Sequence, residues 1–70
     1  MEIKKGDRVK INSLGLTIVG EVLSAVNYKN YFEEKDNWYI EIISDSNEYH
    51  YWKQKEDGGE VRKLKKNKEK

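Results

Sequence analysis

Short segments in which apolar and polar residues alternate recur along this chain, and this period of two residues points to a fold built from strands. Alternation places one set of side chains on each face of a strand, so that one face meets a core and the other meets water. The first such segment follows Gly6, where Val9 and Ile11 share one face and charged residues share the other. We therefore predict a first strand over residues 7–12, ended by a turn at residues 13–16.

The second predicted strand, residues 17–28, is rich in β-branched and small residues. Counting alternate positions places one set of side chains on a common face, namely Ile18, Val22, Val26 and Tyr28. Gly20 lies between the first two and marks a bend or a bulge. A helical interpretation of residues 20–28 stays open, although this segment has neither a clear cap nor a polar face.

Residues 38–54 are predicted to form a hairpin. Three side chains face one side (Trp38, Ile40 and Ile42), and three face the other (Tyr39, Glu41 and Ile43). The sequence Asp-Ser-Asn at residues 45–47 favours a tight turn, and residues 48–54 return as a fourth strand. In that strand Tyr49 and Tyr51 share a face, and Trp52 lies on the opposite one.

Two further connections and a fifth strand complete the prediction. Residues 27–37 are polar and suit a mobile connection. Gly58 and Gly59 permit a turn, after which residues 60–64 form a short strand whose Val61 and Leu64 face the core. No apolar residue follows Leu64, so residues 65–70 are predicted to be a disordered, lysine-rich tail.

The length of 70 residues allows one domain with one small core, assigned here to residues 1–64. Cysteine is absent, so packing has to stabilise the fold without disulfides or a thiolate metal site. Five short strands fit a strongly bent antiparallel sheet that closes on itself and leaves no exposed edge. The alternative is an open meander of three or four strands with a helix formed from part of residues 20–34.

The predicted strands resemble those of SH3-like small barrels, including the KOW and Tudor-like groups. The resemblance rests on Gly-Asp-Arg-Val-Lys-Ile at residues 6–11, Gly15, and Ile-Val-Gly-Glu-Val at residues 18–22. It continues through Trp-Tyr-Ile-Glu-Ile at residues 38–42, Tyr51-Trp52, and Val-Arg-Lys-Leu at residues 61–64. Small phage and mobile-element proteins of Gram-positive bacteria are similar in the same way. The resemblance implies a barrel, but SH3-like barrels bind peptides, methylated side chains, RNA, DNA and other subunits, so it implies no single function.

Charge is divided unevenly along the chain. Residues 62–70 hold six basic residues and one acidic residue, a net +5, whereas residues 1–61 hold eight basic and twelve acidic residues, a net −4. The first eight residues are polar and charged, unlike a signal peptide, and no apolar run approaches the roughly 20 residues that cross a bilayer. We therefore expect a cytoplasmic protein with no membrane partner.

Catalytic residue types are scarce, so we expect no enzyme activity. His50 is the only histidine, and it lies between two tyrosines on a predicted strand. Three acids, Glu33, Glu34 and Asp36, lie in the charge-rich connection without a neighbouring base. Neither a metal site nor a phosphate-binding loop is indicated, and no cofactor is expected.

The aromatic residues are the strongest functional signal. There are eight of them, and alternation cannot direct every ring inward. The predicted ligand-binding residues are Tyr28, Tyr31, Tyr39, Tyr49 and Trp52, which would form a shallow aromatic groove for an extended peptide or for stacked bases. The alternative is that the rings fill the ends of a barrel too small for Val and Ile alone.

Two binding functions follow from these features. The first is a non-enzymatic module that contacts a protein or peptide through an aromatic, acidic surface. The second is a nucleic-acid accessory protein that uses the basic residues near the end, namely Arg62, Lys63, Lys65, Lys66 and Lys68, to neutralise phosphates. A solvated tail is the competing interpretation of those lysines, and the acidic body disfavours a polyanion. The working unit is expected to be a monomer or a weak homodimer.

Overall fold

The computed structural model of the chain describes residues 2–29, 32 and 34–65, and these form an all-β protein, as predicted. The strands are β1 (Arg8–Ser13), β2 (Leu16–Asn27), β3 (Trp38–Ser44), β4 (Tyr49–Lys53) and β5 (Glu60–Leu64), with a helical turn α1 (Gln54–Asp57) between the last two. They form one antiparallel sheet in the order β4-β3-β2-β1-β5. The five predicted strands are all present.

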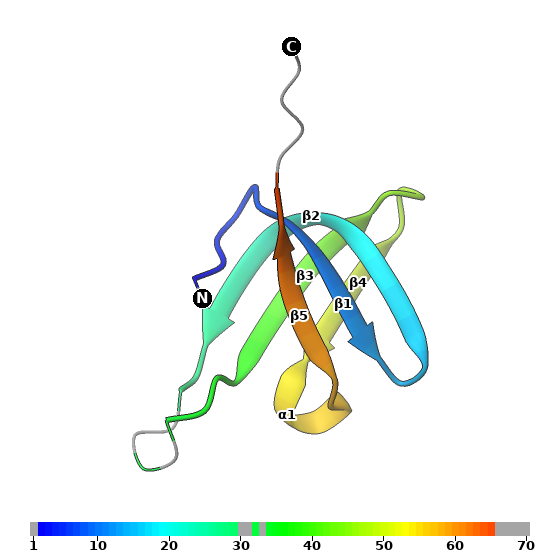
Figure 1. The fold of residues 1–70 in the computed structure, drawn as a ribbon. Coiled ribbons are helices and arrows are strands. Elements are labelled where there is room, and N and C mark those ends of the chain that lie inside the picture. The colour runs from blue at the N-terminus through cyan, green and yellow to red at the C-terminus, as the bar shows by residue number, and fades with distance from the viewer. Residues whose placement is uncertain (1, 30–31, 33, 66–70) are drawn as a thin grey trace.

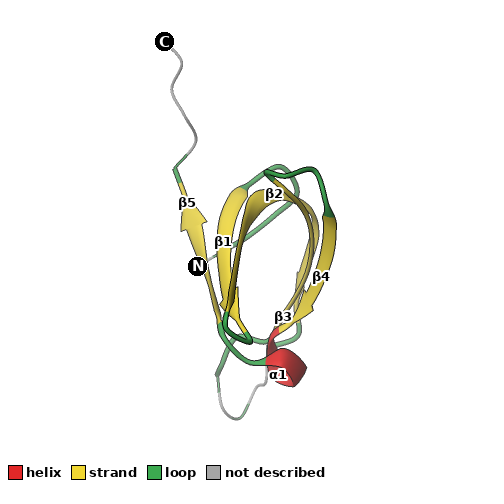
Figure 2. Ribbon diagram, turned by 90° about the vertical axis from the view of Figure 1, so that its right-hand side faces the viewer, coloured by secondary structure: helices red, strands yellow, loops and turns green. Residues whose placement is uncertain are grey.

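The sheet is bent so strongly that it forms two layers. Figure 2 shows β1 and β5 on one side and β3 and β4 on the other, while Figure 1 shows the long β2 arching over the top. The register explains this arrangement, because β2 pairs with β1 over its first half, up to Glu21, and with β3 from Gly20 onward. One strand therefore belongs to both layers.

Gly20 lies where β2 passes from one layer to the other. A Cβ atom placed on Gly20 would lie 2.0 Å from the carbonyl oxygen of Ile43, so only glycine allows β2 to approach β3 this closely. The sequence predicts a bend or a bulge at Gly20. The register shift itself, however, lies between Val22 and Ser24, which makes Leu23 the extra residue of a bulge.

This bulge corrects the predicted faces of β2. An extra residue reverses the alternation that follows it, so the inner face continues from Val22 to Ala25 rather than to Val26. Val26 is 45% exposed and Tyr28 is 57% exposed. The prediction that these two residues share the inner face with Val22 is therefore wrong.

The core fills the space between the two layers. Its buried members are Ile3, Val9, Ile11, Val22, Trp38, Ile40, Ile42, Trp52 and Val61. The three β3 residues predicted to share one face, Trp38, Ile40 and Ile42, are all buried, and Val61 of β5 is buried as predicted, whereas Leu64 is only half-buried. Burying each such aliphatic side chain stabilises the fold by about 1.5–3 kcal/mol, which has to suffice in a chain without cysteines.

The sheet does not close into a barrel, which corrects the predicted closure. Strands β4 and β5 are the two edges of the sheet, and the chain passes from one to the other through α1 and a glycine turn instead of pairing them. Trp52 fills the end of the core beside this connection, with its Nε1 donating a hydrogen bond to the carbonyl oxygen of Gly58 at 3.0 Å. Because the connection from β4 to β5 packs against this end of the core, the core is covered there although β4 and β5 do not pair.

The predicted disordered tail lies largely outside the described residues. Lys65 follows β5 without regular structure and is exposed, while residues 66–70 are not described. The predicted mobile connection is described in part: residues 30, 31 and 33 lie outside the description. At its base, Tyr28 donates a backbone hydrogen bond to Asn37, and Asn37 donates one to the side chain of Asn27.

Candidate functional site: a tyrosine face on the outer side of the sheet

Alternation directs one set of side chains of the second layer outward. On β3 the outward residues include Tyr39 and Glu41, and on β4 they include Tyr49 and Tyr51. In the register, Tyr39 lies opposite both Val26 of β2 and Lys53 of β4, so outward side chains of three strands meet. The sheet thus supports a continuous outer surface on rigid strands.

Three tyrosines lie in contact on this surface, and we call Tyr28, Tyr39 and Tyr51 the tyrosine face. The ring centroids of Tyr28 and Tyr39 are 4.7 Å apart, and those of Tyr39 and Tyr51 are 6.4 Å apart. Both pairs meet edge to face, the arrangement that the charge distribution of aromatic rings favours. Tyr28 and Tyr51 remain about half exposed, at 57% and 49%, so the cluster is held in place but accessible.

A lysine borders the tyrosine face. The Nζ atom of Lys53 lies 5.6 Å from the ring centroid of Tyr51 and forms an ion pair with Glu56 at 3.1 Å. The hydrogen bond that Lys53 donates to Glu56 raises the pKa of Lys53, so the amine keeps its charge. The distance of 5.6 Å is within the range of a cation–π contact, so the amine of Lys53 lies against the ring of Tyr51.

Glu41 anchors the next row of the surface. Its two carboxylate oxygens accept hydrogen bonds from the hydroxyls of Tyr49 and Ser24, each at 2.7 Å. Both bonds lower the pKa of Glu41, and the bond from Tyr49 has the larger effect. The same bond raises the pKa of Tyr49. Glu41 therefore stays anionic beside the tyrosines.

The connection between β2 and β3 is held at the end of the tyrosine face. The backbone N–H of Tyr28 donates to the carbonyl oxygen of Asn37 at 2.9 Å, and the backbone N–H of Asn37 donates to Oδ1 of Asn27 at 2.9 Å. The side-chain amide of Asn27 also donates to Asp36 at 3.1 Å. These bonds fix the position of Tyr28 next to Tyr39.

The structure brings together some of the predicted ligand-binding residues and separates others. Tyr28 and Tyr39 touch, and Tyr49 lies on the same face, joined to it through Glu41. Trp52 is only 3% exposed and points into the core, so its ring is not part of the surface. Tyr31 lies outside the described residues.

Tyr51 belongs to the site but is missing from the prediction. The sequence alone indicates that Tyr51 shares a face of β4 with Tyr49 and that Trp52 lies on the opposite face. The missing information was the position of Tyr39 diagonally across the β3–β4 ladder, because register between strands cannot be taken from alternation alone.

Of the predicted nucleic-acid residues, Arg62 and Lys63 lie on β5, in the other layer of the sheet, and Lys65 follows that strand. Arg62 on β5 is opposite Lys10 on β1, and both point outward, while Lys63 and Lys65 line a hollow of about 550 Å³ at the end of β5. Lys66 and Lys68 lie outside the described residues. The tyrosine face and this basic surface are therefore separated by the bend of the sheet (Figure 2).

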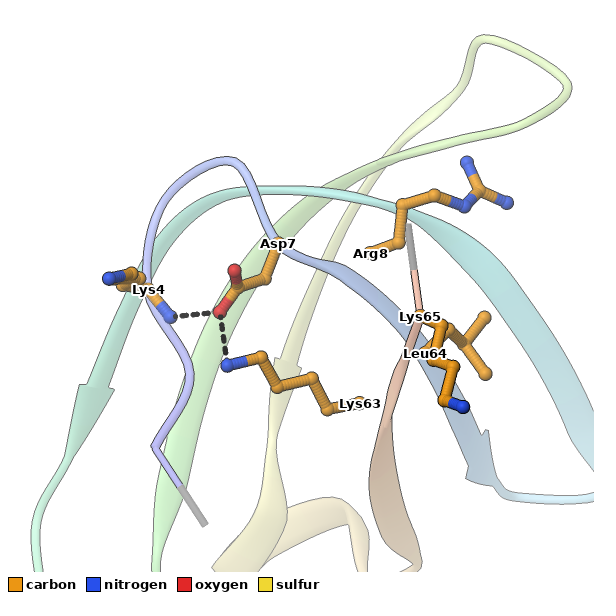
Figure 3. Close-up of a pocket in the computed structure, with 6 residues that line it drawn as sticks. All are labelled: Lys4, Asp7, Arg8, Lys63, Leu64 and Lys65. Atoms are coloured by element: carbon orange, nitrogen blue, oxygen red, sulfur yellow. Dashed lines mark hydrogen bonds and ion pairs between the residues drawn. The ribbon is translucent and has the colours of Figure 1, made fainter. Parts of the chain in front are cut away.

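The hollow contains an acid that neutralises part of its positive charge. Figure 3 shows Asp7 between Lys4 and Lys63, with Arg8 pointing away from it. Asp7 accepts a hydrogen bond from the backbone N–H of Lys4 at 3.0 Å and forms an ion pair with Lys63 at 3.4 Å. The pKa of Asp7 is lowered, first by the Lys4 bond and then by Lys63, so the carboxylate stays charged.

Arg8 also has an acidic partner. Its guanidinium donates two parallel hydrogen bonds to the carboxylate of Asp45, at 3.0 and 2.8 Å. Of the basic residues lining the hollow, two are thus already paired with carboxylates, which weakens its attraction for phosphate.

The described residues contain no cluster of three or more His, Cys, Asp or Glu side chains arranged to hold a metal ion. The Nε2 atom of His50 lies 3.6 Å from a carboxylate oxygen of Glu48. In the part of the chain that the structure describes, no helix has the length and apolar character needed to cross a membrane. Comparisons with protein-family models, with curated proteins and with solved structures give no significant match.

Proposed function

We propose that this protein is a non-enzymatic binding module that holds a protein or peptide segment against its tyrosine face. The observation that carries the proposal is the contact of three tyrosine rings on the outer side of the sheet, two of which, Tyr28 and Tyr51, are about half exposed. Tyrosine offers a large ring and a hydroxyl at little cost in conformational entropy, and it is enriched where proteins bind proteins.

The shape and charge of this surface favour a polypeptide over the other ligand classes. The face lies across β3, β4 and Tyr28, which directly follows β2, and its rings line neither of the hollows that the described residues form, whereas small molecules are usually held in concave sites. Glu41 and Glu56 border it and repel phosphates. An extended polypeptide satisfies both conditions.

The fold that we propose for this module is a small barrel of the SH3-like group in an open form. The support is the single, strongly bent sheet of five antiparallel strands with a short core between its layers. The strand sequences quoted above support the same assignment. Function is argued from the tyrosine face alone, since folds of this kind host many functions.

A peptide-display selection against the immobilised protein tests the proposal. Peptides recovered from it should lose at least about tenfold in affinity for the Tyr39→Ala and Tyr51→Ala variants, because residues at the centre of an interface dominate binding. Arg62→Ala, on the other layer, is the matched control and should bind as the wild type does. Equal binding by the tyrosine variants would refute the proposal.

Nucleic-acid binding is the second candidate, and the alignment of Arg62 with Lys10 beside the basic hollow is the observation that favours it. It is tested by fluorescence anisotropy of labelled DNA and RNA, using the full chain and a version ending at Leu64, at low and near-physiological salt. Binding that survives salt and the truncation would establish this function. Binding that disappears with either change would be non-specific attraction between lysines and phosphates, which is strongly salt-dependent, and would reject nucleic-acid binding as the function.

A further inference from the structure

Strand β4 is an edge of the sheet, and its hydrogen-bonding groups fall into two sets. In the hairpin, the backbone N–H of Ser44 donates to the carbonyl oxygen of Glu48 at 2.8 Å. Hydrogen-bonded pairs recur at every second residue of an antiparallel ladder, so His50 and Trp52 exchange bonds with Ile42 and Ile40. The N–H and C=O groups of Tyr49 and Tyr51 consequently point away from β3, along the open edge.

The same two residues carry exposed rings. Tyr49 is 55% exposed and Tyr51 is 49% exposed on the outer surface. A strand added to β4 would lie about 4.8 Å away, and its outward side chains would stand beside these rings. The edge thus offers backbone bonds for affinity and rings for selectivity at one place.

The open part of the edge is short and has defined ends. At one end lies the turn that follows β3, and at the other the backbone N–H of Lys53 already donates to Oδ2 of Asp57 at 3.3 Å. The free groups therefore belong to Tyr49 and Tyr51, and the open stretch of residues 49–52 has room for an added strand of about four or five residues.

The other edge of the sheet is protected against such pairing. Strand β5 carries exposed Glu60, Arg62 and Lys63, and charged side chains on an edge discourage strand addition. Strand β4 has tyrosines at the corresponding outward positions, Tyr49 and Tyr51. Of the two described edges, β4 is therefore the one whose sequence permits strand addition.

Charge indicates the chemistry of that partner. Residues 41–57, which contain the hairpin and α1, hold five acidic residues and two lysines, a net −3. The carboxylates of Glu48 and Glu56 are mostly exposed at the two ends of β4, and the tyrosine rings attract cations as well. A segment with Lys or Arg at alternate positions would place its charges on this side.

We infer that β4 accepts a basic, extended polypeptide segment as an additional strand, with alternate Lys or Arg side chains lying beside the rings of Tyr49 and Tyr51. This inference rests on the proposed function and names the class of partner and its mode of binding. Backbone pairing with Tyr49 and Tyr51 holds the segment, and the acidic surroundings select its charge.

The probe is a synthetic peptide, acetyl-Lys-Val-Lys-Val-Lys-Val-Lys-amide, titrated by fluorescence and by NMR. Two controls are matched to it: a peptide with Glu in place of every Lys, and one of the same composition with its four Lys and three Val in separate blocks. The alternating basic peptide should bind at least about tenfold more tightly than either control. Equal affinity of the block peptide would mean attraction by charge alone and would overturn the inference.

Methylation of single backbone amides of the probe tests the pairing directly. An N-methyl group removes one N–H, so amides that face β4 should lose about tenfold in affinity and the intervening amides should lose little. A loss that alternates with a period of two residues is the expected result. A uniform response along the probe would overturn strand addition.

Two substitutions of one residue give the corresponding test on the protein. Tyr51→Ala removes the ring but keeps the backbone N–H, whereas Tyr51→Pro removes both, and this N–H makes no bond to β3. We expect Tyr51→Pro to bind the probe at least about fivefold more weakly than Tyr51→Ala, both being checked for the native spectrum. Should Tyr51→Pro unfold the protein, the N-methyl series decides the matter.

These experiments distinguish the two levels of the proposal. If display-selected peptides depend on Tyr39 but the probe series shows no alternation, the tyrosine face binds peptides without strand addition, and only the inference fails. If no selected peptide depends on Tyr39 or Tyr51, the proposed function fails with it.

Discussion

The two layers of the bent sheet share one core but expose different outer faces. The layer of β3 and β4 exposes contacting tyrosines and anionic Glu41, whereas the layer of β1 and β5 exposes Lys10 and Arg62, opposite each other in the register. Core packing constrains inward positions in both layers equally, and it leaves the outward positions open to other requirements. The outward side chains, which differ between the two layers, are therefore the residues from which a binding partner can be inferred.

The largest effect is expected where β2 joins the layers. In Gly20→Ala, the new methyl group would overlap the carbonyl oxygen of Ile43 and the Cα of Ser44, which lie 2.0 and 2.6 Å from the Cβ position. Backbone atoms cannot move aside easily, so we expect a loss of about 4 kcal/mol or more in the free energy of unfolding, which is enough to unfold a small domain. Circular dichroism during urea titration measures it.

The control for Gly20 is Gly15→Ala. Gly15 has a φ of +76°, and a Cβ there would meet nothing within 4 Å, so only backbone strain of about 1–2 kcal/mol is expected. If both variants lose the same stability, the close contact at the join is not what holds the two layers together.

The next effect compares neighbouring residues on opposite faces of β4. Trp52 is 3% exposed, and Trp52→Ala should reduce the free energy of unfolding by about 3–5 kcal/mol through the lost burial and cavity. Tyr51→Ala should reduce it by less than about 1 kcal/mol, because that ring is half exposed. Thermal unfolding followed by tryptophan fluorescence for Tyr51→Ala, and by circular dichroism for Trp52→Ala, gives both values. A greater loss of unfolding free energy for Tyr51→Ala than for Trp52→Ala would mean that the faces of β4 are assigned the wrong way round.

A smaller effect is expected at Asp7, which joins the segment before β1 to β5. The pKa of Asp7 in the folded protein is below its ordinary value of 3.8, so its stabilising contribution is present at neutral pH and is lost as the pH falls through the folded-state pKa. Asp7→Asn should unfold at lower urea than the wild type at pH 7, and the two should converge in acid. A constant difference at every pH would contradict this role.

The smallest effect is expected on the basic layer. Arg62→Ala should leave the midpoint of thermal unfolding unchanged, because the side chain is exposed on an edge strand. It should weaken any binding of DNA at low salt without affecting peptide binding, as titrations of the same sample with both ligands will show. Loss of peptide binding in Arg62→Ala would contradict the assignment of peptide binding to the layer of β3 and β4 alone.

Alternation was sufficient to predict the strands but not their closure. Trp38, Ile40 and Ile42 are buried and Tyr39 faces outward, as their parity indicated. Whether the edges β4 and β5 pair depends on the path of the connection between them, and a single turn of helix is too short to be evident as a periodic pattern.

The site was predicted only in part, for related reasons. The bulge at Leu23 reverses the faces of β2, which moved Val26 and Tyr28 outward, and no residue type in the sequence marks its position. Trp52 was grouped with the tyrosines although its parity is opposite to theirs, and Ile3 was not assigned to the core because it precedes the first alternating segment.

The most direct test of the proposed function is amide chemical-shift mapping by NMR while a display-selected peptide is added to the full-length protein. If the tyrosine face is the binding surface, the largest shifts will fall on β3, β4 and Tyr28, and β1 and β5 will remain unchanged. Shifts concentrated on Lys10, Arg62 and their neighbours would contradict that assignment and would locate binding on the basic layer.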